Sequence, residues 1–360
     1  MKGSIYSIIT GSGSYIPPKI VENKKFHDHV FYNTAGELIP KTNEEIVRKF
    51  QEITEIEERR YADDQYLASD LAYFAAQKAV HDAQIDPETL DYIIVAHNFG
   101  DVRADNLKCD TVPSLASRVK LKLGIENPFT VAYDLPFGCP GWVQGVIQAD
   151  YYLKSGDAKR ILVIGAEILS RIADPHDIDS MIYSDGAGAV ILEAATSEEP
   201  VGVISHLTRT DAVDYAFLLR MGKSYNPNYH DNTIFVKMNG RKLYEYALNT
   251  VPGTVKACID KAGLDISDIK KVLIHQANAK MDDAILSRLF RLYGIKDMPE
   301  GIMPMTISKF GNNSVATVPI LYDLIMKGGM ENQQLNEGDF VVFTSVGAGM
   351  NVNAFIYRMP

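Results

Sequence analysis

The chain is poor in cysteine and in long apolar stretches. Its 360 residues include three cysteines (Cys109, Cys139 and Cys258), an odd number without a pairing pattern, which argues against a disulfide framework and favours a reducing compartment. The N-terminal apolar run stops at Gly11 and is too short for a signal peptide, and no stretch reaches the length of a membrane span. We therefore expect a cytoplasmic protein that does not act at a membrane.

Positive charge is also scarce. Lys and Arg number 36 against 46 Asp and Glu, and the formal net charge is −10. The chain has no basic tail or arm, which argues against nucleic acid as its main partner. A hydrophobic content of 46% with 23% charged residues is typical of a globular protein, and the length suits one large domain or two fused ones.

The sequence contains an internal repeat with a period of about half the chain. Three pairs of segments resemble one another in order: 83-AQIDPETLDYIIVAHN-98 and 262-AGLDISDIKKVLIHQA-277, 150-DYYLKSG-156 and 323-DLIMKGG-329, and 156-GDAKRILVIGA-166 and 338-GDFVVFTSVGA-348. Helices alternate with apolar strands in each copy, which predicts an α/β fold of two sheets with buried helices between them. We expect two duplicated halves, 1–195 and 196–360, and the repeat places Cys139 opposite Asn312.

Cys139 lies in the segment 134-DLPFGCPGWVQG-145, directly before Pro140. The apolar residues of 142–156 have helical spacing, and proline is favoured at the first helical position, so we expect Cys139 at or beside the start of a mostly buried helix. The positive end of a helix dipole favours a thiolate there, which suits a nucleophile. A small buried residue is an equally acceptable interpretation of the same position.

His275 and Asn312 are further candidates. His275 ends the apolar strand 272–274, where a structural role is the more frequent one, and Asn312 in 310-FGNNS-314 is first of all typical of a turn or cap. With Cys139 they would supply a nucleophile, a proton-handling group and a neutral hydrogen-bond donor. The segment 347-GAG-349 follows a strand and offers backbone N–H groups for an oxyanion hole, unless it is a simple strand-end turn.

The order of Cys139, His275 in IHQAN and Asn312 in FGNNS resembles the ketoacyl-acyl carrier protein synthase III branch of the thiolase-like condensing enzymes. The resemblance covers nearly the whole chain and extends to Asp134 and to three further segments: GSGSYIPP at 11–18, SDGAGAVILEA at 184–194 and SVGAGM at 345–350. It implies a layered αβαβα fold of two related halves and a homodimer. It also implies that acyl-coenzyme A or acyl-carrier-protein thioesters are the substrates, with no cofactor besides them.

The resemblance implies a role for each candidate residue. Cys139 would take an acyl group from a thioester, which makes the chain an acyltransferase. His275 and Asn312 would bind the thioester carbonyl of a malonyl- or β-ketoacyl extender and stabilise the enolate that attacks acyl-Cys139 in a Claisen condensation. The backbone N–H groups of Cys139 and Ala348 would form the oxyanion hole, although Ala348 stands where family members usually have glycine.

Several positions depart from the family pattern. Glu45 falls where housekeeping members have a tryptophan that stacks on the adenine of coenzyme A, while Lys49 and Arg171 match basic family positions that contact substrate. Val112 replaces an aromatic residue that the dimer mate contributes to the acyl pocket. These changes disfavour an acetyl-coenzyme A primer and favour a longer or carrier-bound acyl donor, as in relatives that build dialkylresorcinol-type secondary metabolites.

Docking of an acidic carrier protein would need a local basic face. Lys280, Arg288 and Arg291 have a spacing that puts them on one side of a predicted helix, although an ordinary solvated helix face has the same pattern. Two alternatives to the ketosynthase function stay open. One is a ketosynthase that joins two acyl chains into a dialkylresorcinol or cyclohexanedione, and the other is a Cys-His-Asn thioester hydrolase, which would need no extender.

Overall fold

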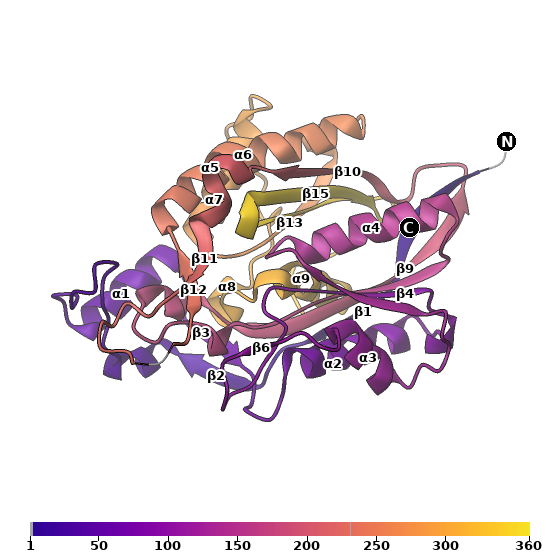
Figure 1. The fold of residues 1–360 in the computed structure, drawn as a ribbon. Helices are drawn as coiled ribbons and strands as arrows, with labels where there is room; N and C mark the ends of the chain where they lie inside the picture. Colours follow the sequence, from indigo (N-terminus) through magenta and orange to yellow (C-terminus); the bar gives the residue numbers. More distant parts are fainter. Residues whose placement is uncertain (1–2, 231) are drawn as a thin grey trace.

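The computed structural model describes residues 3–230 and 232–360, and in this part of the chain two β-sheets face each other across a pair of central helices (Figure 1). The first sheet has the strand order β1-β9-β8-β4-β7 and the second β10-β15-β14-β13. The strands of the first sheet are β1 (Ser4–Tyr15), β4 (Tyr92–His97), β7 (Val131–Pro136), β8 (Arg160–Ile168) and β9 (Asp185–Ser197). Those of the second are β10 (Gly202–Thr210), β13 (Ile269–Ile274), β14 (Phe340–Gly347) and β15 (Asn351–Arg358).

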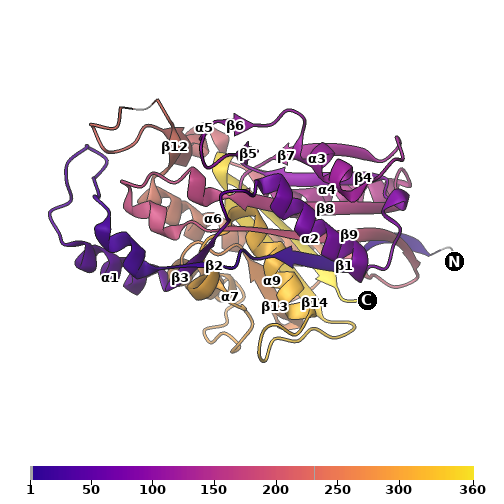
Figure 2. The same ribbon diagram turned by 90° about the horizontal axis from the view of Figure 1, so that it is seen from below.

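Helices complete a five-layer arrangement. Helices α2 (Ala68–Asp82) and α3 (Leu115–Leu123) cover the outer face of the first sheet, and α6 (Gly240–Lys261) and α7 (Ala279–Arg291) cover that of the second. Between the sheets lie α4 (Gly141–Ser155) and α9 (Thr317–Met326), and Figure 2 shows the same layers from below. The predicted α/β layering with buried helices is confirmed.

The segments of the internal repeat occupy equivalent places in the two sheets. Strand β4 pairs with β8 in parallel, and β13 pairs with β14 in the same way. Each pair is then extended by an antiparallel neighbour, β9 in the first sheet and β15 in the second. The predicted boundary after residue 195 falls inside β9, which continues to Ser197, and β10 begins at Gly202.

The two central helices are mostly apolar and buried because they lie between the two sheets. In α4 the buried residues include Trp142, Val143 and Ile147, and in α9 nearly every side chain is buried. The Trp142 ring lies 6.0 Å from that of Phe343 and 6.2 Å from that of Phe355, both on the second sheet. Helix α4 therefore belongs to the core that joins the two halves.

Shorter elements gather at one end of the layers, where the strands lead into long loops (Figure 1). They are the strand pairs β2 (Lys19–Glu22) with β3 (Glu58–Tyr61), β5 (Asp101–Val102) with β6 (Cys109–Asp110) and β11 (Leu219–Gly222) with β12 (Phe235–Met238), and the helices α1 (Asn43–Thr54), α5 (Ala212–Tyr215) and α8 (Ile307–Phe310). In the residues that the structure describes, no helix combines the length and the apolar character that a membrane crossing requires.

Candidate active site

Cys139 lies directly before the central helix α4. Pro140 is the N-cap of this helix, one residue earlier than the first helical position that the sequence predicted for it, so Cys139 is beside the helix start as expected. Burial nevertheless raises the pKa of the Cys139 thiol to about 11, against the opposite effect of a hydrogen bond from Ser314. Burial therefore acts against the thiolate, opposite to the effect that the sequence predicted for the helix start.

Asn312 is held by its backbone in a fixed orientation. Its N–H donates to the carbonyl of Ile182 and its carbonyl accepts from the N–H of Ser184, both at 2.9 Å. The side-chain Oδ1 accepts a hydrogen bond of 2.7 Å from the N–H of Ser314. Because Oδ1 already has this donor, Nδ2 is the end of the amide that can donate to a ligand.

His275 directly follows the last residue of β13, and its backbone N–H donates to the carbonyl of Thr344 at 3.0 Å. Burial lowers the pKa of His275 to about 4, against a smaller opposite effect of the Ser314 backbone. The imidazole is therefore neutral at physiological pH. A neutral imidazole can donate one hydrogen bond to a carbonyl oxygen without delivering a proton to a nearby carbanion.

One cavity of about 710 Å³ brings the three candidates together. Cys139 enters it from the first half of the chain, and His275 and Asn312 enter it from the second. Most of the remaining wall is apolar and comes from α1, from the segments after β4 and β8, and from β11, β12 and α6. Its members include Phe50, Ile53, Phe99, Leu169, Tyr183, Leu219, Met221, Val236 and Leu243. The arrangement suits an apolar ligand whose reacting end lies at Cys139.

Two glycines allow the segments around Cys139 to approach closely. A Cβ atom on Gly347 would lie 2.7 Å from the backbone nitrogen of Cys139, so the turn that carries Ala348 packs directly on the backbone of Cys139. A Cβ atom on Gly165 would lie 2.4 Å from the carbonyl oxygen of Val315, which follows the Asn312–Ser314 segment. Any larger residue at either position would push one side of the site away from the other.

A hydrogen-bonded chain that the sequence did not reveal lies behind the thiol. Ser314 donates from Oγ to Sγ of Cys139 at 3.3 Å, and Asn98 donates from Nδ2 to Oγ of Ser314 at 3.0 Å. Asn98 also donates to the carboxylate of Glu167 from Nδ2 at 2.5 Å and from its backbone N–H at 2.7 Å. The one available signal was Glu167 itself, a charged residue inside the apolar run of β8.

The structure separates the predicted basic binding residues. Lys49 lies on α1 and lines the cavity, while Glu45 forms a capping box with Thr42 at the start of the same helix. Arg171 is buried outside the cavity wall, and its guanidinium donates to the backbone carbonyls of Val102, Asp63 and Asp64. These donors tie three segments of the first half together, and contact of Arg171 with substrate stays a prediction.

Lys280, Arg288 and Arg291 lie on α7, and all three are exposed. Arg288 donates to the carbonyl of Leu248 and to Oδ1 of Asn249 on α6. Asn278, the N-cap of α7, lines the cavity. The basic residues therefore lie on a helix that starts at the cavity wall.

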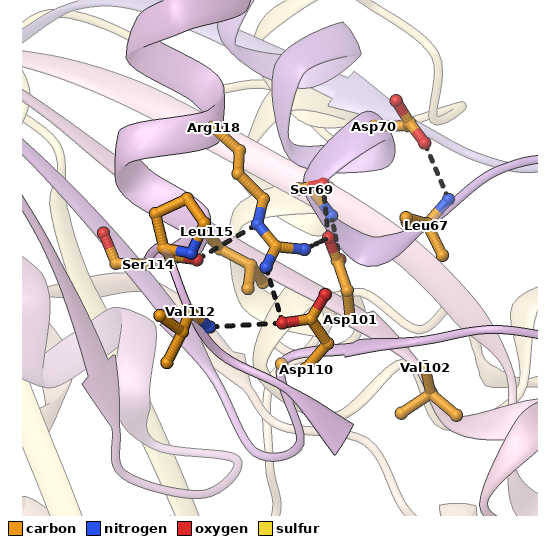
Figure 3. Close-up of polar contacts among 12 residues, drawn as sticks. Leu67, Ser69, Asp70, Asp101, Val102, Asp110, Val112, Ser114, Leu115 and Arg118 are labelled. Carbon is orange, nitrogen blue, oxygen red and sulfur yellow. Dashed lines mark hydrogen bonds and ion pairs between the residues drawn. The ribbon is translucent and has the colours of Figure 1, made fainter. Parts of the chain in front are cut away.

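Val112 lies away from the cavity of its own chain, on a loop that is braced from α3. Figure 3 shows Arg118 donating to the carboxylates of Asp101 and Asp110, at 2.5 and 2.8 Å. Asp110 in turn accepts from the N–H of Val112 at 3.2 Å. Val112 is 83% exposed.

Comparisons with known proteins agree with this geometry. The profile of the family described as 3-oxoacyl-[acyl-carrier-protein (ACP)] synthase III matches residues 133–212, and the profile of its C-terminal part matches residues 259–359. A beta-ketoacyl-[acyl-carrier-protein] synthase III of Erythrobacter litoralis (strain HTCC2594) is 33% identical over 356 residues, which cover 98% of this chain and 99% of the relative.

Solved structures of similar proteins share the fold. A 3-oxoacyl-[acyl-carrier-protein] synthase III from Aquifex aeolicus VF5 is 28% identical, with a TM-score of 0.79 and coverage of 98% of this chain and 99% of the other. A beta-ketoacyl-[acyl-carrier-protein] synthase III from Thermus thermophilus is 29% identical, with a TM-score of 0.78 and the same coverage.

Proposed function

Because the chain belongs to the 3-oxoacyl-[acyl-carrier-protein] synthase III family and is a condensing acyltransferase of thiolase-like fold, we propose that Cys139 is its acyl acceptor and that His275 and Asn312 bind the extender. The observation that carries this proposal is the single cavity that holds all three side chains, contributed by two halves of the chain. A nucleophile and two neutral donors at one apolar cavity are the groups that a Claisen condensation of thioesters requires.

In the first half-reaction Sγ of Cys139 attacks the carbonyl carbon of an acyl thioester. The new S–C bond forms, the old one breaks, and the thiol proton leaves with the departing thiol, so no other reactant is needed. The carbonyl oxygen becomes an oxyanion during this step, and we assign the N–H groups of Cys139 and Ala348 as its donors. The close packing of their two segments supports this assignment, since a Cβ atom on Gly347 would lie 2.7 Å from the nitrogen of Cys139 and one on Gly138 3.0 Å from that of Ala348. Two such donors stabilise the transition state more than the ground state.

In the second half-reaction the extender thioester accepts hydrogen bonds from His275 and from Nδ2 of Asn312. Loss of CO₂ from a malonyl-type extender leaves an enolate whose charge rests on that carbonyl oxygen. The enolate carbon then attacks the acyl carbon, and Cys139 leaves as a thiolate that takes up one proton. The low pKa of His275 matters here, since an imidazolium would protonate the enolate before it reacted.

The substrates we propose are acyl thioesters of coenzyme A or of an acyl carrier protein, and the steps above balance with these thioesters and one proton from solvent. The apolar wall fits the acyl chain, and Lys49 lies at the α1 side of the cavity, where it can meet a phosphate or carboxylate. Lys280, Arg288 and Arg291 supply exposed positive charge on α7 for an acidic carrier. A cytoplasmic location remains a prediction.

We also propose a homodimer formed along β7. This strand ends the first sheet, so one row of its backbone groups faces outward, and exposed apolar side chains surround it. Phe129 is 84% exposed and Val131 46%. In a dimer built on this edge, Val112 of the partner subunit closes the acyl end of the cavity. Light scattering should show a dimer for the wild type and a monomer for Phe129→Asp, and a monomeric wild type would refute the proposal.

The direct test of function is the intact mass of the protein after exposure to a panel of acyl-coenzyme A and acyl-carrier-protein donors. We expect a stable acyl adduct that is absent from Cys139→Ala, and its size and donor identify the preferred substrate. Addition of a malonyl or β-ketoacyl thioester should then discharge the adduct into a condensed product. Release of free acid from the donor without an extender would instead identify a hydrolase, and no adduct from any donor would refute Cys139 as the acyl acceptor.

A further inference from the structure

The polar groups behind Cys139 form one continuous chain from a buried carboxylate to the reacting sulfur. Glu167 accepts from Asn98, Asn98 donates to Ser314, and Ser314 donates to Cys139. Glu167 and Ser314 are buried, and the contacts join β8, the segment after β4 and the segment after Asn312. The chain therefore links both halves of the molecule at the nucleophile.

The hydrogen bonds of this series run in one consistent direction, from Asn98 to Glu167 and to Ser314 and from Ser314 to Cys139. The backbone N–H of Asn98 can only donate, and it donates to Oε2 of Glu167, so this oxygen is an acceptor and Asn98 turns its Nδ2 and not its Oδ1 toward it. The second hydrogen of the same Nδ2 then points at Oγ of Ser314. Because Oγ accepts from Asn98, its own single hydrogen is available to Sγ of Cys139, and Ser314 donates in the contact of 3.3 Å.

We propose that Glu167 and Asn98 are positioning residues that commit the Ser314 hydroxyl to donating toward Sγ of Cys139, and that this donated hydrogen bond stabilises the thiolate. This inference rests on Cys139 being the acyl acceptor. The thiolate appears when Cys139 attacks the donor and again when it leaves the acyl group, so one hydrogen bond serves both half-reactions. Without Glu167 the Asn98 amide can reverse, and Ser314 would then donate to Oδ1 of Asn98 and withdraw its hydrogen from the sulfur.

Other features of the chain agree with this direction. Ser314 has a φ angle of 52°, an orientation that a residue other than glycine adopts only when its surroundings hold it. The N–H of Ser314 is fixed by Oδ1 of Asn312, so the hydroxyl and the donor amide of Asn312 are held on one short segment. The backbone N–H of Asn98 also donates to the same oxygen of Glu167, which requires an acceptor at that place.

The test is the rate at which iodoacetamide alkylates Cys139 as a function of pH, read on the peptide that carries Cys139, with the exposed Cys109 as the internal reference. Loss of a hydrogen bond to a charged sulfur changes a thiol pKa by roughly 1 unit. We expect Ser314→Ala to shift the alkylation profile upward by about this amount. Asn98→Ala and Glu167→Ala should shift it in the same direction.

Two further variants separate this role from a merely structural one. Glu167→Gln keeps an acceptor opposite the Asn98 backbone N–H, so its alkylation should have the wild-type pH dependence. Glu167→Ala removes this acceptor, so its alkylation profile should be shifted. Thr317→Val removes a buried hydroxyl that finds no partner among the described residues, and it should leave the profile unchanged. Thermal unfolding of each variant shows which of them are folded. If Glu167→Ala does not fold, Asn98→Ala, at a half-buried position, still tests the hydrogen-bonded series from Glu167 to Cys139.

The outcome does not depend on the proposed acyl transfer, because alkylation requires no acyl substrate. A wild-type profile in folded Ser314→Ala would overturn the role of the hydroxyl. A shift in Ser314→Ala with none in folded Asn98→Ala would overturn the roles of Asn98 and Glu167. A failure of acyl loading alongside the expected shifts would refute the proposed function and leave the hydrogen-bonded chain in place.

Discussion

Substitution of Asn312 should separate the two half-reactions. Its two amide ends do different things: Oδ1 accepts from Ser314 at 2.7 Å, and Nδ2 is available to the extender. Removal of one oxyanion donor costs about 10²–10³ in rate. A buried N–H left without an acceptor costs about 1–3 kcal/mol of folding free energy, and each kcal/mol lowers the Tm of a large domain by about 2–4 °C. Asn312→Ala should lose both the donor to the extender, which lowers the condensation rate, and the acceptor for the Ser314 N–H, which lowers the stability.

Asn312→Asp is the matched control, because its carboxylate keeps the acceptor for Ser314 and loses the donor. We expect both variants to condense about 10²–10³ times more slowly than the wild type. Acyl loading of Cys139 should stay within a few-fold of wild type, and Asn312→Ala should be the less stable of the two. Loading is read by intact mass, decarboxylation by CO₂ release and stability by thermal unfolding. Equal losses of loading and condensation would refute the separation of roles.

Three further results are expected. Gly165→Ala places a Cβ 2.4 Å from the carbonyl oxygen of Val315, so it should lower both the Tm and the condensation rate. Gly253→Ala, whose Cβ meets nothing within 4 Å, is the control and should lower neither. A Tm and a condensation rate equal to wild type in Gly165→Ala would contradict the close approach. Lys237→Met leaves two buried aspartates without their cation, which should cost about 3–5 kcal/mol in urea unfolding, and an unchanged midpoint would contradict this. The pKa of His275 is about 4 in the folded protein and about 6.5 in an unfolded chain, so the unfolded state binds more protons between these values and stability should fall as pH drops through this window. His275→Asn should abolish that part of the pH dependence, measured as the free energy of unfolding at pH 4.5 and 7, and a variant with the wild-type dependence would contradict it.

The sequence predicted the layered fold and the meeting of the candidate residues because both follow from the repeat. Equivalent segments of two duplicated halves occupy equivalent places, so the loop before α4 and the segment before α9 had to face each other across the interface. Cys139 and Asn312 lie on these two segments. Apolar runs in α4 and α9 likewise predicted burial on all sides.

The chain behind the thiol could not be predicted in the same way. Glu167 and Asn98 are 69 positions apart, and Ser314 and Cys139 are 175 apart, so no local spacing connects them. The raised pKa of Cys139 could not be predicted for a related reason, since a helix start is visible in the sequence and the loss of water around a side chain is not. Arg171 shows the same limit, because its partners are backbone carbonyls that carry no residue-type signal.

The close contact between Gly165 and the segment after Asn312 has a consequence for how this enzyme varies. In the proposed reaction Cys139 and Asn312 act together from different halves, so the distance between them is also a measure of how the halves are docked. A substitution in the central layer that tilts one half slightly would leave the fold intact and still be felt as a change in turnover. The turnover rate is then more sensitive to the alignment of the two halves than the melting temperature is. Substitutions in the central layer are therefore restricted by their effect on catalysis as much as by their effect on stability.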